Sequence, residues 1–258
     1  MSPAAGATSR VCLVTGASAG IGAAIARGFA ELGWPVAIGA RRPERLEKVG
    51  AELEAGGARV LLQSLDVSKR ASLDAFFEAA EKRLGPVDVL VNNAGLCVPG
   101  LLHEVAPEDL EFEVATNLVG PLLLARRAVA SMRATGRRGD LVFVSSENAI
   151  RPRPYQVAYT ATKSGLEGLA RSLRMELEGT GIRSTIVRPG PTGTEFGRDW
   201  DPGVLQRLLE SWRYWGVQRH LRWMPPESVA RAVLGAVTAP PGTHLDEIQL
   251  MPEGPSPA

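Results

Sequence analysis

The chain has 258 residues, of which 45% are hydrophobic and 22% charged, and its formal net charge is +1. These values are typical of a globular protein, and the near-neutral charge gives no indication of binding to nucleic acid or to an anionic membrane. With only two cysteines, Cys12 and Cys97, we expect neither a disulfide framework nor a metal site. The sequence shows no apolar leader and no apolar run of ~18 residues, so we expect a cytoplasmic location.

Short apolar runs alternate with amphipathic segments of helical length along most of the chain. The expected strands cover 11–16, 35–40, 59–67, 87–95, 140–146, 182–190 and 244–251. The expected helices cover 21–32, 43–55, 70–84, 107–134, 157–179 and 226–238. This alternation predicts an α/β fold: a doubly wound Rossmann-type domain with a parallel sheet of about seven strands and helices on both faces. We expect one domain over 10–258, preceded by a flexible tail at 1–9.

A glycine-rich segment, Val-Thr-Gly-Ala-Ser-Ala-Gly-Ile-Gly at 14–22, joins the first expected strand to the first expected helix. Gly16 permits a tight turn, Gly20 lets the backbone approach a pyrophosphate, and Gly22 lets the helix pack closely on the strand. The helix N-terminus then offers free N–H groups to the phosphates. An ordinary strand–helix turn is the alternative. The predicted dinucleotide contacts of this turn are Gly16, Ser18, Ala19, Gly20, Ile21 and Gly22.

The Thr-Gly-x-x-x-Gly-x-Gly spacing resembles the signature of the short-chain dehydrogenase/reductase family, and further motifs follow in the family's order. They are Asp66-Val67, Asn92-Asn93-Ala94-Gly95, Asn117, Ser145-Ser146, Tyr159-x-x-x-Lys163 and Pro189-Gly190-x-x-x-Thr194. The resemblance covers nearly all of 10–251. It implies an NAD(P)-dependent oxidoreductase that acts on CH–OH groups by hydride transfer.

The resemblance also implies contacts to the cofactor beyond the glycine-rich turn. It places Asp66 and Val67 at the adenine ring, and Thr194, with the preceding Pro-Gly pair, at the nicotinamide carboxamide. The cofactor contacts implied in this way are Asp66, Val67, Asn93, Ala94, Gly95, Tyr159, Lys163, Pro189, Gly190 and Thr194.

Four residues carry the catalytic role that the resemblance implies. Tyr159 is the general acid in reduction and the base in oxidation, and Lys163 hydrogen-bonds the nicotinamide ribose. Ser146 polarises the substrate carbonyl, and Asn117 holds a water of a proton relay. Because Tyr159 and Lys163 share a helix face, we expect the ammonium to lower the phenol pKa from ~10 into a working range. Taken one at a time, these residues also fit purely structural roles, such as a surface pair for the tyrosine and lysine or a helix cap for the serine.

The segment after the second expected strand bears on which nicotinamide cofactor binds. An NAD-dependent enzyme usually ends this strand with an acid that binds the ribose 2′-hydroxyl, and here the position is Ala40. Arg41 follows, supported by Arg42, and a guanidinium suits a 2′-phosphate. We therefore predict NADP, with NAD as the alternative. The arginines also fit as solvated residues at the start of a helix.

Substrate contacts are expected from the loop 147–156 and from an insert over about 192–223. Arg151 and Arg153 in the loop suit an anionic group or solvent. The insert is rich in tryptophan and suits a lid over an apolar carbonyl or alcohol; a helix packed on the body or on a partner subunit is the alternative.

Three functions remain open at this stage: an NADP(H)-dependent carbonyl reductase, an NAD-dependent alcohol or hydroxysteroid dehydrogenase, and a non-catalytic dinucleotide-binding sensor. The four catalytic residues argue against the sensor. By analogy with the family, the apolar faces of helices 107–134 and 157–179 predict a homodimer or homotetramer.

Overall fold

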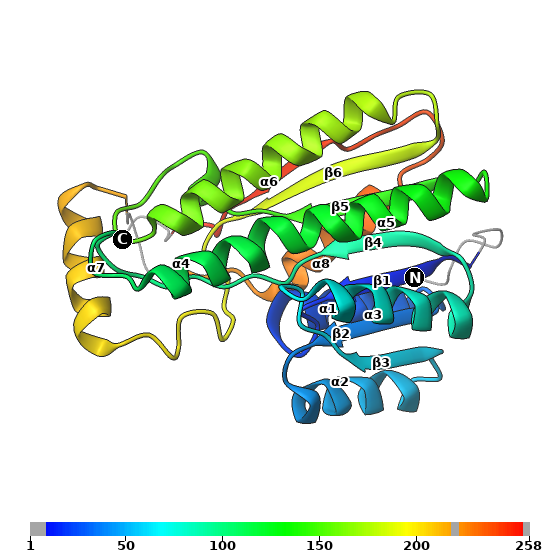
Figure 1. Ribbon diagram of the computed structural model, residues 1–258, viewed down its shortest axis with the longest axis horizontal. Coiled ribbons are helices and arrows are strands. Elements are labelled where there is room, and N and C mark those ends of the chain that lie inside the picture. The colour runs from blue at the N-terminus through cyan, green and yellow to red at the C-terminus, as the bar shows by residue number, and fades with distance from the viewer. Residues whose placement is uncertain (1–8, 218–221, 255–258) are drawn as a thin grey trace.

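The computed structural model describes residues 9–217 and 222–254 (Figure 1). Seven parallel strands form a sheet with the order β3-β2-β1-β4-β5-β6-β7. The strands are β1 (Val11–Thr15), β2 (Val36–Ala40), β3 (Val60–Ser64), β4 (Val87–Asn92), β5 (Gly139–Val144), β6 (Ile182–Pro189) and β7 (Glu247–Leu250). The predicted doubly wound parallel sheet is thereby confirmed. The predicted tail at 1–9 lies outside the described residues except for Ser9.

Helices cover both faces of the sheet. They are α1 (Gly20–Glu31), α2 (Pro43–Ala55), α3 (Arg70–Leu84), α4 (Pro107–Val114), α5 (Gly120–Ala134), α6 (Val157–Glu176), α7 (Pro202–Tyr214) and α8 (Pro226–Val237). The apolar residues of α1, α2 and α8 share one buried cluster with the sheet, and those of α3, α5 and α6 share the other. Every residue of β1 and β4 is buried, because helices cover both faces of the sheet. Strands in such a position carry apolar side chains on both sides, which explains their nearly continuous apolar sequences.

The strand order reverses between β1 and β4. From β1 the chain winds outward through β2 to β3, and from β4 it winds in the opposite direction through β5 and β6 to β7. A crevice forms beyond the carboxyl ends of the strands at such a switch point, and ligands of open α/β sheets bind there. This edge of the sheet carries the residues described below.

The segment expected as one helix over 107–134 contains three parts. Helix α4 passes into a π-helical turn at Ala115–Val119, which then continues as α5. The hydrogen bonds of a π turn span one residue more than those of an α-helix, so the turn is locally wider. Asn117 lies in this turn, and its side chain bonds the Leu96 backbone. The expected strand at 244–251 is also shorter, since only Glu247–Leu250 pairs with β6.

The tryptophan-rich insert contains α7, which lies at the end of the molecule where α4 and α6 begin (Figure 1). Trp200 donates its indole N–H to the Cys97 carbonyl, and Trp212 donates to the Pro154 carbonyl, both at 3.0 Å. Leu208 is fully buried, whereas Tyr214 and Trp215 are exposed. The insert thus packs on the loops that follow β4 and β5.

Among the described residues, no helix is both long enough and apolar enough to cross a membrane.

Candidate active site

The glycine-rich turn lies at the carboxyl end of β1. Gly16 and Gly20 have φ values of +68° and +55°, in the left-handed region that favours glycine. A Cβ placed on Gly22 would lie 2.5 Å from both Asn93 Nδ2 and the Gly16 carbonyl oxygen, so a larger residue does not fit there. The structure therefore favours glycine at all three positions, at Gly16 and Gly20 through the backbone conformation and at Gly22 through the lack of room.

Thr15 joins this turn to the loop after β4. Its hydroxyl oxygen accepts hydrogen bonds from the backbone N–H groups of Asn93 and Ala94, both at 3.0 Å. Asn93 Nδ2 in turn donates to the carbonyls of Thr15 and Gly16, at 2.9 and 3.2 Å. Thr15 was not among the predicted site residues, although its place directly before Gly16 in the motif was a usable signal.

The start of α1 is suited to a pyrophosphate. Ala19 is the extended N-cap residue and supplies no side-chain cap to the N–H groups of the first turn. Thr194 lies against the turn, since a Cβ placed on Gly20 would be 3.0 Å from Thr194 Cγ2. Pro189 and Gly190 hold this segment at the end of β6, where the Gly190 N–H donates to the Leu250 carbonyl. The turn therefore fits a dinucleotide.

Asp66 and Val67 follow β3 at the same edge of the sheet. One carboxylate oxygen of Asp66 accepts bonds from the backbone N–H and the hydroxyl of Ser68, at 3.0 and 2.7 Å. A Cβ placed on Gly120 would lie 2.4 Å from the Val67 carbonyl oxygen, so the start of α5 packs directly on this residue. The Asp66 side chain is thus fixed by its own turn.

Tyr159 and Lys163 lie on α6, and 9% and 4% of their surfaces are exposed. Lys163 Nζ donates a 2.8 Å hydrogen bond to the Val144 carbonyl at the end of β5, and it lies 5.7 Å from the centre of the Tyr159 ring. A Cβ placed on Gly95 would be 3.4 Å from Lys163 Nζ and 3.3 Å from Asn117 Oδ1. Gly95 therefore lies between the lysine and Asn117.

Asn117 fastens the loop after β4 to the π turn. Its Oδ1 accepts from the Leu96 N–H at 2.9 Å, and its Nδ2 donates to the Leu96 carbonyl at 2.7 Å. Nδ2 also donates to Thr162 Oγ1 on α6, at 3.2 Å. The structure thus brings this residue beside Lys163 and shows that its side-chain atoms are engaged by the protein.

The expected lowering of the Tyr159 pKa by Lys163 is not what the structure shows. Burial raises the pKa of Tyr159 well above its ordinary value, and a hydrogen bond with Ser146 opposes this rise in pKa. Burial also lowers the pKa of Lys163 to about 8, against the charges of Glu113 and Glu167. Desolvation of the phenolate is the stronger effect. Tyr159 consequently holds its proton at neutral pH, which suits a proton donor.

A buried charge network supports the serine pair at the end of β5. Ser145 Oγ donates to Glu167 Oε1 at 2.8 Å. Glu167 also forms a two-point ion pair with Arg188 on β6, at 2.8 and 2.7 Å. Glu167 and Arg188 were not predicted, because neither belongs to a motif with recognisable spacing. They hold α6 against β5 and β6 next to Ser146.

The two arginines after β2 have different surroundings. Arg41 stacks over the Phe112 ring, 5.1 Å from its centre. Arg42 donates to the Ser18 hydroxyl at 3.2 Å and to Glu195 Oε2 at 3.2 Å. Glu195 also pairs with Arg45. Arg42, rather than Arg41, therefore contacts the glycine-rich turn.

The loop after β5 is largely committed to internal contacts. Buried Glu147 pairs with Arg153 at 2.7 Å and with Arg151 at 3.3 Å. Arg153 also stacks on Trp212, 4.7 Å from the ring centre. Asn148 Nδ2 donates to Gln156 Oε1 at 2.6 Å. Arg153 is thus held inside the protein, whereas the side chain of Arg151 remains largely exposed to solvent.

Two aromatic side chains of the insert pack in sequence on Tyr159. Phe196 packs against Tyr159 with ring centres 5.6 Å apart, and Trp200 packs edge-on against Phe196 at 5.8 Å. Phe196 remains 44% exposed. The insert therefore contributes an aromatic wall beside Tyr159.

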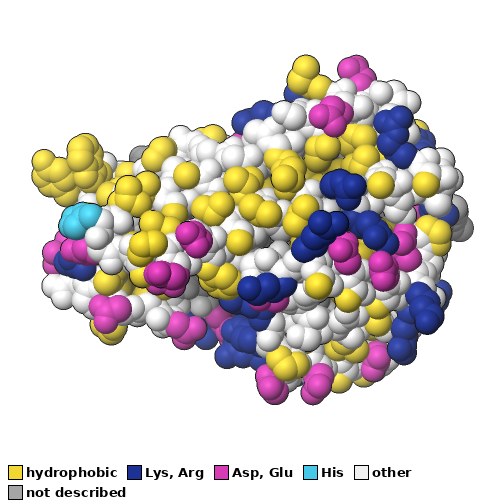
Figure 2. Space-filling model, viewed as in Figure 1, with side chains coloured by type: hydrophobic (Ala, Val, Ile, Leu, Met, Phe, Trp, Pro, Cys, Tyr) yellow, Lys and Arg dark blue, Asp and Glu magenta, His cyan; other side chains and the backbone are white. Residues whose placement is uncertain are grey.

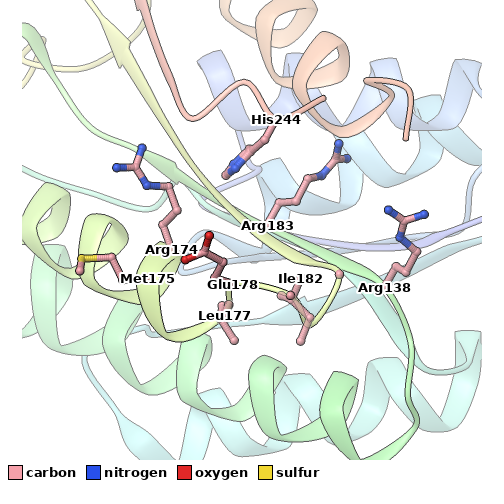
Figure 3. Close-up of a pocket in the computed structure, with 10 residues that line it drawn as sticks. Arg138, Arg174, Met175, Leu177, Glu178, Ile182, Arg183 and His244 are labelled. Atoms are coloured by element: carbon pink, nitrogen blue, oxygen red, sulfur yellow. The ribbon is translucent and has the colours of Figure 1, made fainter. Parts of the chain in front are cut away.

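A hollow of about 510 Å³ lies at the opposite edge of the sheet (Figure 3). Its lining comes from the starts of β5 and β6 and the end of α6, and includes Arg138, Arg174, Arg183 and His244. The amino and carboxyl ends of parallel strands lie at opposite edges, so this hollow is remote from Tyr159. None of the predicted site residues lines it.

The protein-family model described as short chain dehydrogenase matches residues 10–204. The chain belongs to this family. Short-chain dehydrogenases are NAD(P)-dependent oxidoreductases, and the enzyme class that the motifs predict is thereby confirmed.

Two curated short-chain dehydrogenase relatives cover almost the whole chain. The 2,3-dihydro-2,3-dihydroxybenzoate dehydrogenase of Bacillus subtilis is 36% identical over 97% of each chain. The glycine betaine reductase ATRR of Emericella nidulans is 33% identical over 95% of this chain, which spans only 19% of that protein. Among solved structures, the chain is similar to an alcohol dehydrogenase from the archaeon Thermococcus sibiricus, complexed with 5-hydroxy-NADP. The two share 32% identity with a TM-score of 0.80, and the match covers 94% of this chain and 96% of the archaeal chain.

Proposed function

We propose that the protein is an NADP(H)-dependent oxidoreductase that interconverts a carbonyl and a secondary alcohol, with Tyr159 as the general acid/base. The observation that carries this proposal is the grouping of Tyr159, Lys163, Ser146 and Asn117 at the carboxyl edge of the sheet, next to the glycine-rich turn. A non-catalytic dinucleotide-binding sensor would not need these four residues, and this chain retains all of them.

The side chains divide the reaction between them. A bound nicotinamide supplies or accepts the hydride. Tyr159, protonated at neutral pH, donates its phenolic proton to the carbonyl oxygen as the alcohol forms and takes it back in oxidation. Ser146 donates a hydrogen bond to the same oxygen and stabilises the charge that develops there. Lys163 supplies a positive charge beside the phenol, and its hydrogen bond to the Val144 carbonyl fixes the position of its ammonium group.

The preference for NADP rests on Arg42. Its guanidinium lies against Ser18, beside the end of β2 where the adenosine ribose would lie, and no acidic residue ends β2 to bind a 2′-hydroxyl. Ser18 and Arg42 together offer a hydroxyl and a fork of N–H donors to a 2′-phosphate. The Thermococcus sibiricus relative, solved with 5-hydroxy-NADP, supports the same preference. The cytoplasmic location stays a prediction of the sequence.

The aromatic wall of Phe196 and Trp200 favours a substrate with an apolar group next to its carbonyl. A panel of ketones, aldehydes, 3-oxo acids and ketosteroids, followed by NADPH absorbance, tests both the activity and this preference. We expect turnover of at least one ketone and tighter binding of NADPH than of NADH. Tighter binding of NADH would overturn the cofactor assignment and favour the NAD-dependent alternative.

We further propose that the protein forms a homodimer or homotetramer through α4, α5 and α6. Hydrophobic side chains gather over these helices on the face shown in Figure 2. The exposed apolar residues of these helices and of the π turn between α4 and α5 include Val114, Val119, Leu122 and Val157. Exposed apolar patches on a folded chain mark interaction surfaces. Light scattering is expected to give twice or four times the monomer mass, and a monomer at micromolar concentration would contradict the proposal.

A further inference from the structure

Asn148 is a buried amide that lies two residues after the proposed catalytic serine, and the reaction described above does not use it. It is 3% exposed and belongs to the short 3₁₀ turn Glu147–Ala149 that follows β5. Its backbone N–H donates to Ser146 Oγ at 3.2 Å. Asn148 is therefore one hydrogen bond away from the hydroxyl that the proposed function assigns to the substrate carbonyl.

The side chain of Asn148 has only one of its two polar atoms paired. Its Nδ2 donates to Gln156 Oε1 at 2.6 Å, whereas its Oδ1 accepts no hydrogen bond from a described residue. The unpaired side-chain atoms that the protein encloses completely include those of Thr116 and Thr160, but not this oxygen. The Asn148 oxygen is thus an accessible acceptor in a buried residue, and such an atom takes a donor from water or from a ligand.

Gln156 fixes the direction in which the Asn148 amide points. Its own Nε2 donates to Cys97 Sγ at 3.5 Å, so the Asn148–Gln156 amide pair joins the loop after β5 to the loop after β4. Tyr155, directly before Gln156, has a φ of +66°, which is strained for a residue with a side chain. The Tyr155 carbonyl accepts from the Gly100 N–H at 2.9 Å and is held in this conformation. The amide pair is therefore in place before a substrate binds.

The amide pair and the aromatic wall meet at Cys97. Its Sγ accepts from the amide pair at 3.5 Å, and its carbonyl accepts from the Trp200 indole at 3.0 Å. At their other ends, the aromatic wall packs on Tyr159 and the amide pair contacts Ser146. A hydrogen bond between Tyr159 and Ser146 closes this ring of contacts. A carbonyl bound by these two hydroxyls therefore has an apolar wall on one side and an open hydrogen-bond acceptor on the other.

We propose that Asn148 is a specificity-determining residue that accepts a hydrogen bond from a hydroxyl on the carbon next to the substrate carbonyl. The substrate class is then an α-hydroxy ketone with an apolar group on its other side, or the corresponding vicinal diol in oxidation. A ketone without this hydroxyl leaves the Asn148 oxygen unpaired, which penalises its binding. The inference rests on the proposed function, since it requires the carbonyl to bind at Tyr159 and Ser146.

A matched pair of ketones tests the substrate class. α-Hydroxyacetophenone carries the donor, whereas α-fluoroacetophenone carries a group of similar size and electron withdrawal that cannot donate. For the wild type we expect kcat/KM, measured by NADPH absorbance, to be about 10- to 100-fold higher with the hydroxy ketone. Equal values, or no reduction of the hydroxy ketone, would overturn the inference. The proposed function would still stand if the wild type, but not Tyr159→Phe, reduced another ketone.

Two variants of Asn148 separate recognition from folding. Asn148→Ala removes the acceptor, so the preference for the hydroxy ketone should fall to within about threefold. A purely structural loss would slow both ketones alike and leave their ratio unchanged. Asn148→Asp keeps an oxygen at this position, and a half-turn of the Gln156 amide lets Nε2 donate to the second carboxylate oxygen. This variant should therefore keep a preference of about tenfold or more.

Gln206→Ala, which alters an exposed amide on α7, is the control variant and should keep the wild-type ratio. A ratio that stays unchanged in Asn148→Ala would overturn the role of Asn148. So would an Asn148→Asp protein that loses the preference as completely as Asn148→Ala does.

Discussion

The Arg42 guanidinium donates a 3.2 Å hydrogen bond to the Ser18 hydroxyl and so joins the start of α2 to the glycine-rich turn. This contact places a cation where the ribose of a bound dinucleotide would lie. Replacement by Arg42→Ala should weaken NADPH binding by about 10- to 100-fold, the value of one or two charge-assisted bonds, and leave NADH binding unchanged. Fluorescence titration with both cofactors measures this difference. Arg41→Ala is the matched control, and an equal loss for NADH would contradict the assignment.

Glu195 competes for the same guanidinium. It pairs with Arg42 at 3.2 Å and also with Arg45, and both pairs are solvent-exposed. Because a 2′-phosphate needs the arginine donors that Glu195 occupies, Glu195→Gln should tighten NADPH binding by up to about fivefold. The effect has the opposite sign to that of Arg42→Ala. Weaker NADPH binding in this variant would show that Glu195 supports the cofactor site instead.

The alkaline limit of reduction should follow Lys163. Its pKa is lowered to about 8, so the side chain is an ammonium below that pH and loses its charge as the pH rises through it. Tyr159, with its raised pKa, keeps its proton over the same range. The kcat/KM of reduction should therefore be flat near neutrality and fall about tenfold per pH unit above pH 8. A profile that stays flat to pH 10 would argue against a charged lysine in the reaction.

The Arg188–Glu167 pair is expected to be important for stability. The two side chains are 6% and 2% exposed and share two hydrogen bonds. Arg188→Met leaves a buried carboxylate without its main partner, and we expect a loss of about 3 to 5 kcal/mol in the free energy of unfolding. Urea denaturation measures it, with exposed Arg213→Met on α7 as the control. A loss below 1 kcal/mol would mean that Arg171 compensates.

The fold and the proposed catalytic residues could be predicted from the sequence because their signals are local. Alternating apolar runs predicted the sheet, and motif spacing predicted Tyr159, Lys163 and Asn117 together. The residues that were missed depend on tertiary contacts. Glu167 shows nothing unusual as one of several acids in its segment, and its ion pair with Arg188 forms only when α6 packs on β6.

The choice between Arg41 and Arg42 shows the same limit. Both follow β2 directly, and the sequence favoured the first. The structure turns Arg41 toward Phe112 and Arg42 toward Ser18. Likewise, the sequence predicted that Lys163 would lower the Tyr159 pKa, but how far the phenol is desolvated is set by the packing of α6 and the insert around it.

The central claim is that Tyr159 transfers the proton in carbonyl reduction, and Tyr159→Phe tests it most directly. The variant keeps the ring that packs on Phe196 and removes only the hydroxyl. With a ketone that the wild type reduces, kcat should fall by about 100- to 10,000-fold while NADPH binding changes by less than about twofold. Turnover at the wild-type rate by a folded Tyr159→Phe protein would contradict the account.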